Sequence, residues 1–95
     1  MNKILNIKNL LSKVKDLKNK RSKIVLCHGV FDLLHPGHIN HFIEAKNLGD
    51  VLIVSITSDK FVNKGPGRPV FNEMLRAQSI SQLINLDYVF INNEK

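Results

Sequence analysis

Residues 23–38 have the sequence KIVLCHGVFDLLHPGH, in which an apolar run is followed at once by a turn and a histidine-rich segment. The run at 23–29 is short, apolar and β-branched, which is typical of a strand inside a parallel sheet. It ends at Gly29. The segment 30–34 then leads into a helix whose first turn should hold Pro36. Proline suits the first helical position because an N–H there would have no partner within the helix.

The expected helix start at 35–38 has the composition of a phosphate-binding site. A helix N-terminus offers unpaired backbone N–H groups and the positive end of the helix dipole. Gly37 has no Cβ to hold a phosphate away from the backbone. His35 and His38 are three residues apart, so both imidazoles can donate hydrogen bonds to one reacting phosphoryl centre. For either histidine alone, a surface or helix-capping role is the ordinary alternative.

The rest of the chain alternates apolar runs with helical patterns. The helix opened by His38 should end near Gly49, a position suited to a left-handed cap. The pattern then predicts a strand at 51–57, a loop at 58–69, a helix at about 72–84 and a strand at 88–91. This β-α-β-α-β order predicts an α/β fold with a Rossmann-like, three-stranded parallel sheet.

The first 22 residues predict a separate amphipathic, basic helix ahead of a domain at 23–95. Apolar residues recur at helical spacing at positions 4, 7, 10, 11, 14 and 17, with lysines between them. The apolar stripe should pack on the domain or on a partner chain. A membrane-surface role is the weaker alternative, because the stripe contains no Trp or Phe.

Composition narrows the class of protein. Ninety-five residues suit one small domain. The net charge of +6 comes from residues 1–23, which hold eight Lys or Arg and one acidic residue. With no aromatic platform there, nucleic acid is not an expected partner. Neither a membrane-spanning run nor a secretory signal is present, so we expect no membrane contact and a cytoplasmic location. The single cysteine, Cys27, should pack as a small apolar residue.

Residues 29–38, GVFDLLHPGH, resemble the signature of the cytidylyltransferase-like nucleotidyltransferases. That family includes glycerol-3-phosphate cytidylyltransferase and the heptose-1-phosphate adenylyltransferase domain. The similarity continues at 45–50 (AKNLGD), 58–59 (SD), 64–70 (KGPGRPV), 76–77 (RA) and 87–89 (DYV). It therefore covers about residues 23–91, and the 64–70 stretch is more similar to the members that act on sugar phosphates.

The resemblance implies a transfer reaction. AMP or CMP would pass from ATP or CTP to a phosphorylated small molecule, with a sugar phosphate favoured, and pyrophosphate would leave. Mg²⁺ would be held mainly by the triphosphate, with no metal site made by the protein itself. Because the acceptor phosphate oxygen is already a nucleophile, positioning and charge stabilisation would be sufficient for catalysis.

The resemblance also implies roles for individual residues. The catalytic residues would be His35, His38 and Lys64. The nucleotide-binding residues would be Gly29, Val30, Phe31, Gly37, His38 and Arg76. The substrate-binding residues would be Asp32, Thr57, Asp59 and Arg68. Each has an ordinary alternative: Asp32 can form an Asx turn, Lys64 can be a solvated loop residue, Arg76 can lie on a helix surface, and residues 57–59 can form a turn and helix cap.

The resemblance stops short of the whole family domain. Family members continue with a further strand and a helix that helps to hold the nucleotide phosphates, and this sequence has no counterpart of them. We therefore expect residues 23–95 to be the N-terminal portion of such a domain, with the strand at 24–29 exposed at a sheet edge. The alternatives to an active transferase are a truncated module that only binds nucleotide and one that only dimerises. Homo-oligomers would form through the exposed edge or the first helix.

Overall fold

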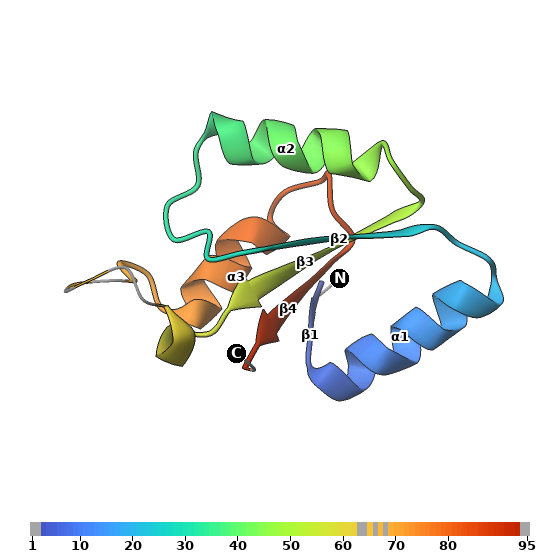
Figure 1. Ribbon diagram of the computed structural model, residues 1–95, viewed down its shortest axis with the longest axis horizontal. Coiled ribbons are helices and arrows are strands. Elements are labelled where there is room, and N and C mark those ends of the chain that lie inside the picture. The colour runs from blue at the N-terminus through green and yellow to red at the C-terminus, as the bar shows by residue number, and fades with distance from the viewer. Residues whose placement is uncertain (1–2, 63–64, 66, 68, 94–95) are drawn as a thin grey trace.

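One parallel sheet with helices on both faces makes up the chain (Figure 1). The structure is a computed structural model and describes residues 3–62, 65, 67 and 69–93. The elements are, in order, β1 (Ile4–Leu5), α1 (Ile7–Asn19), β2 (Ile24–Gly29), α2 (Pro36–Lys46), β3 (Val51–Thr57), the 3-10 helix η1 (Asp59–Phe61), α3 (Glu73–Ser81) and β4 (Tyr88–Asn92).

The sheet contains the three predicted strands and one that was not predicted. The strand order is β1-β4-β3-β2, and all pairs are parallel. The additional strand is β1, in which Ile4 pairs with Val89. The expectation that Ile4 belongs to the first helix is therefore wrong. The helix begins at Ile7, because the Asn6 side chain caps it by accepting the N–H of Asn9 at 2.8 Å.

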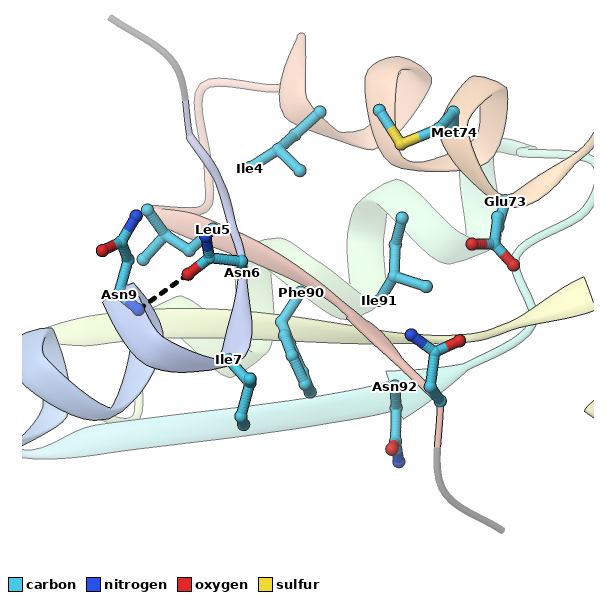
Figure 2. Close-up of a pocket in the computed structure, with 11 residues that line it drawn as sticks. Ile4, Leu5, Asn6, Ile7, Asn9, Glu73, Met74, Phe90, Ile91 and Asn92 are labelled. Atoms are coloured by element: carbon cyan, nitrogen blue, oxygen red, sulfur yellow. Dashed lines mark hydrogen bonds between the residues drawn. The ribbon is translucent and has the colours of Figure 1, made fainter.

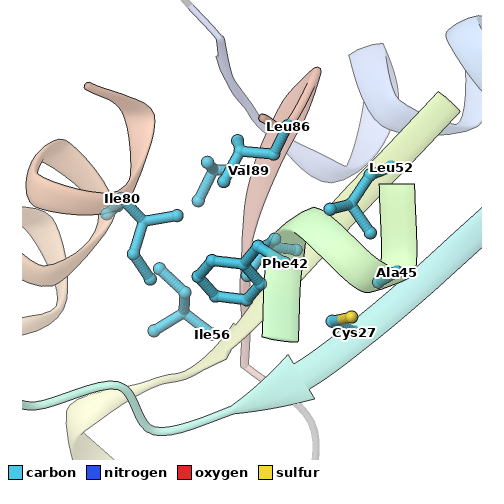
Figure 3. Packing of buried hydrophobic residues seen from close by; sticks show 10 residues of the cluster. Cys27, Phe42, Ala45, Leu52, Ile56, Ile80, Leu86 and Val89 are labelled. Carbon is cyan, nitrogen blue, oxygen red and sulfur yellow. The ribbon is translucent and has the colours of Figure 1, made fainter. Parts of the chain in front are cut away.

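The helices α2 and α3 share one face of the sheet, and the core lies between them and the strands. Cys27, Val54 and Val89 are in register across three strands, so they point to the same face. Figure 3 shows the side chains that cover them. These come from α2 (Phe42 and Ala45) and α3 (Ile80), joined by Leu52, Ile56 and Leu86.

The opposite face of the sheet carries α1 and is less well covered. Lys13 Nζ lies 5.5 Å from the centre of the Tyr88 ring, which places α1 on that side. No residue of α1 is buried, and Leu11 of its apolar stripe is 61 % exposed. Leu26 of the edge strand β2 points to this face and is 65 % exposed, and β2 pairs only with β3 among the described residues. Within that part of the chain no helix has the length and apolarity that crossing a membrane needs.

Gly49 is needed for a different reason from the predicted one. The residue that caps the end of α2 is Asn47, in a right-handed conformation, and Gly49 does not have a positive φ. A Cβ on Gly49 would instead lie 2.7 Å from Val25 Cγ2 and 2.8 Å from the carbonyl oxygen of Lys23. The prediction of a left-handed cap is therefore wrong, and close packing against β2 explains the glycine. The helix α3 also ends earlier than predicted, at Ser81, and the turn after it places Leu83 against the core.

The buried thiol of Cys27 should react slowly. Desolvation by burial raises the pKa of Cys27 above its usual value of 9.0, so less reactive thiolate is present at neutral pH. We expect native protein to react with iodoacetamide at least about tenfold more slowly than protein unfolded in urea. Mass spectrometry over a time course measures both rates, and equal rates would contradict the packing of Cys27 against α2.

Candidate functional site

The predicted site residues within the described chain come together at the carboxyl edge of the sheet. β2 ends at Gly29 and β3 at Thr57, and the loops that follow them approach the start of α3 (Figure 1, left). Ligands of open parallel α/β sheets bind at this edge. The helix start predicted at Pro36 is confirmed, with Pro36 as the first residue of α2.

The two motif histidines cap the start of α2. His35 is the N-cap residue, and its Nδ1 accepts the N–H of Gly37 at 3.0 Å. The backbone N–H of His35 donates to Nδ1 of His38 at 3.3 Å, which completes a reciprocal capping box. The two rings stack with their centroids 3.9 Å apart. Capping is therefore a confirmed function of both histidines, and it brings the two imidazoles side by side.

The capping bonds also determine which ring nitrogen carries the proton. A nitrogen that accepts an N–H has no proton of its own, so Nδ1 is unprotonated in both rings. In this arrangement Nε2 is the nitrogen of each ring that is placed to donate. No acidic residue lies in the first turn of α2 to offset the helix dipole. The helix start thus combines a positive dipole with two Nε2–H donors, a combination suited to an anion.

Gly37 is required by His35. A Cβ at this position would lie 2.7 Å from Cε1 and 3.0 Å from Nδ1 of the His35 ring. Any larger residue would therefore push the imidazole out of its capping position. The predicted reason for the glycine was access of a phosphate to unpaired helix N–H groups. In the structure the Gly37 N–H bonds to His35 Nδ1, and the N–H groups of His38 and Ile39 bond to the His35 carbonyl.

Phe31 connects the site to the core. Its φ of 50° is in the left-handed region, which a bulky residue rarely adopts. Its ring covers Gly29, where an added Cβ would lie 2.8 Å from the ring. The same ring contacts the His38 ring edge-on, with their centroids 5.6 Å apart, and packs on the Phe42 ring, with their centroids 5.2 Å apart. The predicted nucleotide contacts of Gly29 and Phe31 stay predictions, while their mutual packing is a feature of the fold.

Asp32 holds a distant loop. Its two carboxylate oxygens accept the backbone N–H groups of Val70 and Phe71, at 2.7 and 2.8 Å. These partners are 38 and 39 residues further along the chain, so the bonds are not those of a local Asx turn. The predicted contact of Asp32 with substrate stays a prediction.

Arg76 is buried, and only 1 % of its surface is exposed. The alternative of a helix-surface arginine is therefore wrong. Its guanidinium donates to the carbonyl oxygens of Val30, Thr57 and Phe71 and to the Asp59 carboxylate, at 2.6 to 3.0 Å. Its predicted contact with a nucleotide phosphate stays a prediction.

The remaining predicted residues fall into two groups. Thr57 and Asp59 lie at the end of β3, and Oγ1 of Thr57 donates to the Gly29 carbonyl at 3.4 Å. Lys64 and Arg68 lie outside the described residues. Sequence reasoning missed Glu73, whose Oε1 accepts the N–H of Asp59 at 2.9 Å. Its position directly after the Asn72 N-cap was the available signal.

A cavity of about 670 Å³ lies beside the predicted site, at the carboxyl ends of β1 and β4 (Figure 2). Its polar wall includes Asn6, Asn9, Glu73 and Asn92, and its apolar wall includes Met74 and Phe90. None of the motif residues 29–38 lines it. The sequence did not predict it, because one of its walls is the unpredicted strand β1.

Comparison with known proteins identifies the family. Residues 26–95 match the model of the cytidylyltransferase-like family, and the chain belongs to this family of nucleotidyltransferases. Over 94 residues it is 43% identical to the bifunctional protein HldE of Helicobacter pylori (strain G27) and 37% identical to that of Methylobacillus flagellatus. Each alignment covers 97% of this chain, but only 20% and 19% of the relatives, so the chain spans about a fifth of their length.

A solved structure supports the same fold. The crystal structure of the lipopolysaccharide core biosynthesis protein from Thermoplasma volcanium GSS1 superposes with a TM-score of 0.70 at 36% sequence identity. The match covers 76% of this chain and 59% of that one. The predicted Rossmann-like α/β fold is therefore confirmed, with four parallel strands in place of three.

Two substitutions of His35 test the capping role. Replacement by Ala should lower the free energy of unfolding by about 1 kcal/mol, the usual cost of a lost N-cap. Replacement by Asn should preserve it, since Asn is among the preferred N-cap residues. Urea denaturation measures both, with Asn40→Ala on an exposed position of α2 as the control. Equal losses for the Ala and Asn variants would contradict this role.

Proposed function

We propose that the chain is part of a nucleotidyltransferase that moves AMP or CMP from ATP or CTP to a phosphorylated small molecule. The observation that carries the proposal is the pair of stacked imidazoles that cap the start of α2, in a member of this family. In the reaction, an oxygen of the acceptor phosphate forms a bond to the α-phosphorus of the nucleotide. The bond from that phosphorus to the bridging oxygen breaks, and pyrophosphate leaves with the electron pair.

His35 and His38 would stabilise the transition state of this reaction. Negative charge grows on the phosphoryl oxygens as the α-phosphorus becomes five-coordinate. The Nε2–H donors of both rings, held in place by capping bonds through Nδ1, would bind these oxygens at the positive end of the α2 dipole. Because the rings are already fixed, little reorganisation is needed as the charge develops.

The other residues of the proposed site would bind and orient the reactants. We assign nucleotide contacts to Gly29, Val30, Phe31 and Gly37, and charge stabilisation on pyrophosphate to Lys64. Arg76 belongs to the same site through the loops that it bonds together. We assign acceptor contacts to Thr57, Asp59 and Arg68, and to Asp32 a place in the acceptor site through the segment whose N–H groups it binds. Mg²⁺ bound to the triphosphate would supply further charge stabilisation. Asp32 and Asp59 already hold protein partners, which agrees with a metal ion held mainly by the nucleotide.

A sugar phosphate is the favoured acceptor. The Thermoplasma volcanium relative is described as a lipopolysaccharide core biosynthesis protein, which is consistent with sugar chemistry. The proposed location is the cytoplasm, where nucleoside triphosphates are available.

A second candidate function is a nucleotide-binding or dimerising module without catalysis. The edge position of β2 favours it, because an apolar edge strand with a neighbour on one side only, among the described residues, invites pairing with another chain. Light scattering over a range of concentrations distinguishes the two functions when combined with the activity assay below.

The main test is pyrophosphate release from ATP or CTP with a panel of sugar phosphates. We expect the protein to bind one of the two nucleotides in calorimetry and to release pyrophosphate weakly, and only when an acceptor is present. The His38→Ala variant should lose about 10²-fold in turnover, comparable to the loss of one oxyanion donor. His41→Ala, on the same helix, is the matched control. Near-normal turnover of the His38 variant would overturn the catalytic assignment, and binding without turnover would favour the second candidate.

Substitution of Gly37 tests whether His35 must stay in its capping position. In Gly37→Ala the new methyl group would displace the His35 ring, so we expect nucleotide affinity to fall roughly tenfold with a smaller effect on stability. Calorimetry and thermal denaturation of the same samples give the two quantities. Unchanged affinity would mean that the start of α2 is not the phosphate-binding position.

A further inference from the structure

The loops at the carboxyl edge of the sheet surround one buried cation. The Arg76 side chain has no exposed surface, and its Nη1 donates to the carbonyl oxygens of Val30 at 2.9 Å and Thr57 at 2.7 Å. Its Nε donates to the Phe71 carbonyl at 3.0 Å, and its Nη2 pairs with Oδ1 of Asp59 at 2.6 Å. Four of the five guanidinium N–H groups are therefore used by the protein itself.

The partners of Arg76 belong to three separate segments. Val30 follows β2, Thr57 and Asp59 lie at the end of β3, and Phe71 precedes α3. Carbonyl groups beyond the ends of strands have no partners in the sheet and need other donors when they are buried. One rigid guanidinium supplies these donors, so the relative positions of the three segments depend on it.

Asp32 holds one of these segments from the opposite side. Its carboxylate accepts the N–H groups of Val70 and Phe71, while Arg76 binds the Phe71 carbonyl. Both peptide groups of Phe71 are thus bonded to charged side chains. Asp32 itself is three residues before His35 in the motif loop, so these bonds connect the segment at 69–72 to the start of α2.

We infer that Arg76 and Asp32 are positioning residues that fix the segment 69–72 against the motif loop, and that Arg76 itself is not a ligand of nucleotide phosphate. This inference rests on the proposed function for its effect on nucleotide binding. In the sequence, the segment directly follows the stretch that contains Lys64 and Arg68, the two cations assigned to the reactants. Loss of either positioning residue would therefore weaken nucleotide binding without removing a group that touches the nucleotide.

The direction in which nucleotide affinity changes in an Asp32 variant distinguishes a positioning role from a purely electrostatic one. Removing a negative charge near a bound triphosphate should strengthen binding if charge alone matters. Asp32→Asn removes that charge but can accept only one of the two N–H groups, because its NH₂ faces the other. Positioning therefore predicts weaker binding for this variant, the opposite direction.

The experiment compares Asp32→Asn and Arg76→Lys with Asp50→Asn in the full chain. The control residue Asp50 also accepts a backbone N–H, that of Lys23 at 2.7 Å, but at the amino end of the strands. Calorimetry with MgATP and MgCTP gives affinities, and hydrogen exchange gives the protection of the Val70 and Phe71 amides. We expect roughly tenfold weaker binding and faster exchange at both amides for the first two variants, with neither change for the control.

Other outcomes overturn the inference in separate ways. Equal or tighter binding by Asp32→Asn would refute positioning by Asp32, and weaker binding by Arg76→Lys with normal exchange would make Arg76 a direct ligand. If Asp32→Asn does not fold, Asp32→Glu replaces it, since it keeps the charge but displaces the oxygens and should also weaken binding. If the unchanged protein binds neither nucleotide, the proposed function fails, and the exchange rates alone decide whether the two side chains hold the segment.

Discussion

A parallel strand that ends leaves backbone N–H and C=O groups without sheet partners, and burial of these groups is tolerated only when other groups bond to them. At the carboxyl edge of this sheet, the backbone groups that need such partners lie in three loops that approach one another. Arg76 supplies donors to their carbonyl groups, and Asp32 supplies acceptors to their N–H groups. A buried cation is costly unless its donors are satisfied, so the loops and the guanidinium stabilise one another.

Phe31 connects these loops to α2, the helix that holds the motif histidines. A left-handed φ in a bulky residue costs about 1–2 kcal/mol. The cost is offset by the ring, which covers Gly29, touches His38 and reaches Phe42 in the core. The position of the His38 imidazole therefore depends on core packing as well as on its own capping bond. A substitution in the core that moves Phe42 would also shift the His38 imidazole at the start of α2.

Sequence patterns predicted most of the fold because its main signals are local. The apolar strands β2, β3 and β4 and the proline at the start of α2 follow from strand composition and helix-end preferences. The strand β1 did not, because two residues carry no measurable period and its pairing partner β4 is remote in sequence.

Within the candidate site, the positions of the histidines were predictable, but the environment of Arg76 was not. A clue was present in the helix period, since Arg76 shares the buried face of α3 with Ala77 and Ile80. What it would bond to there depends on backbone carbonyls from loops far apart in the chain. No pattern of side chains records those contacts.

The pairing of β1 with β4 affects the order in which the molecule can assemble. Lys3, beside β1, donates to the carbonyl of Leu83, 80 residues away in the sequence. The strand β1 therefore has no partner until almost all of the chain shown here has been made, whereas β2 and β3 can pair much earlier. Contacts of such long sequence separation form slowly, because a large loop must close before they contribute. The α1 helix and its preceding strand would then dock last, onto a sheet whose carboxyl-edge loops are already in place.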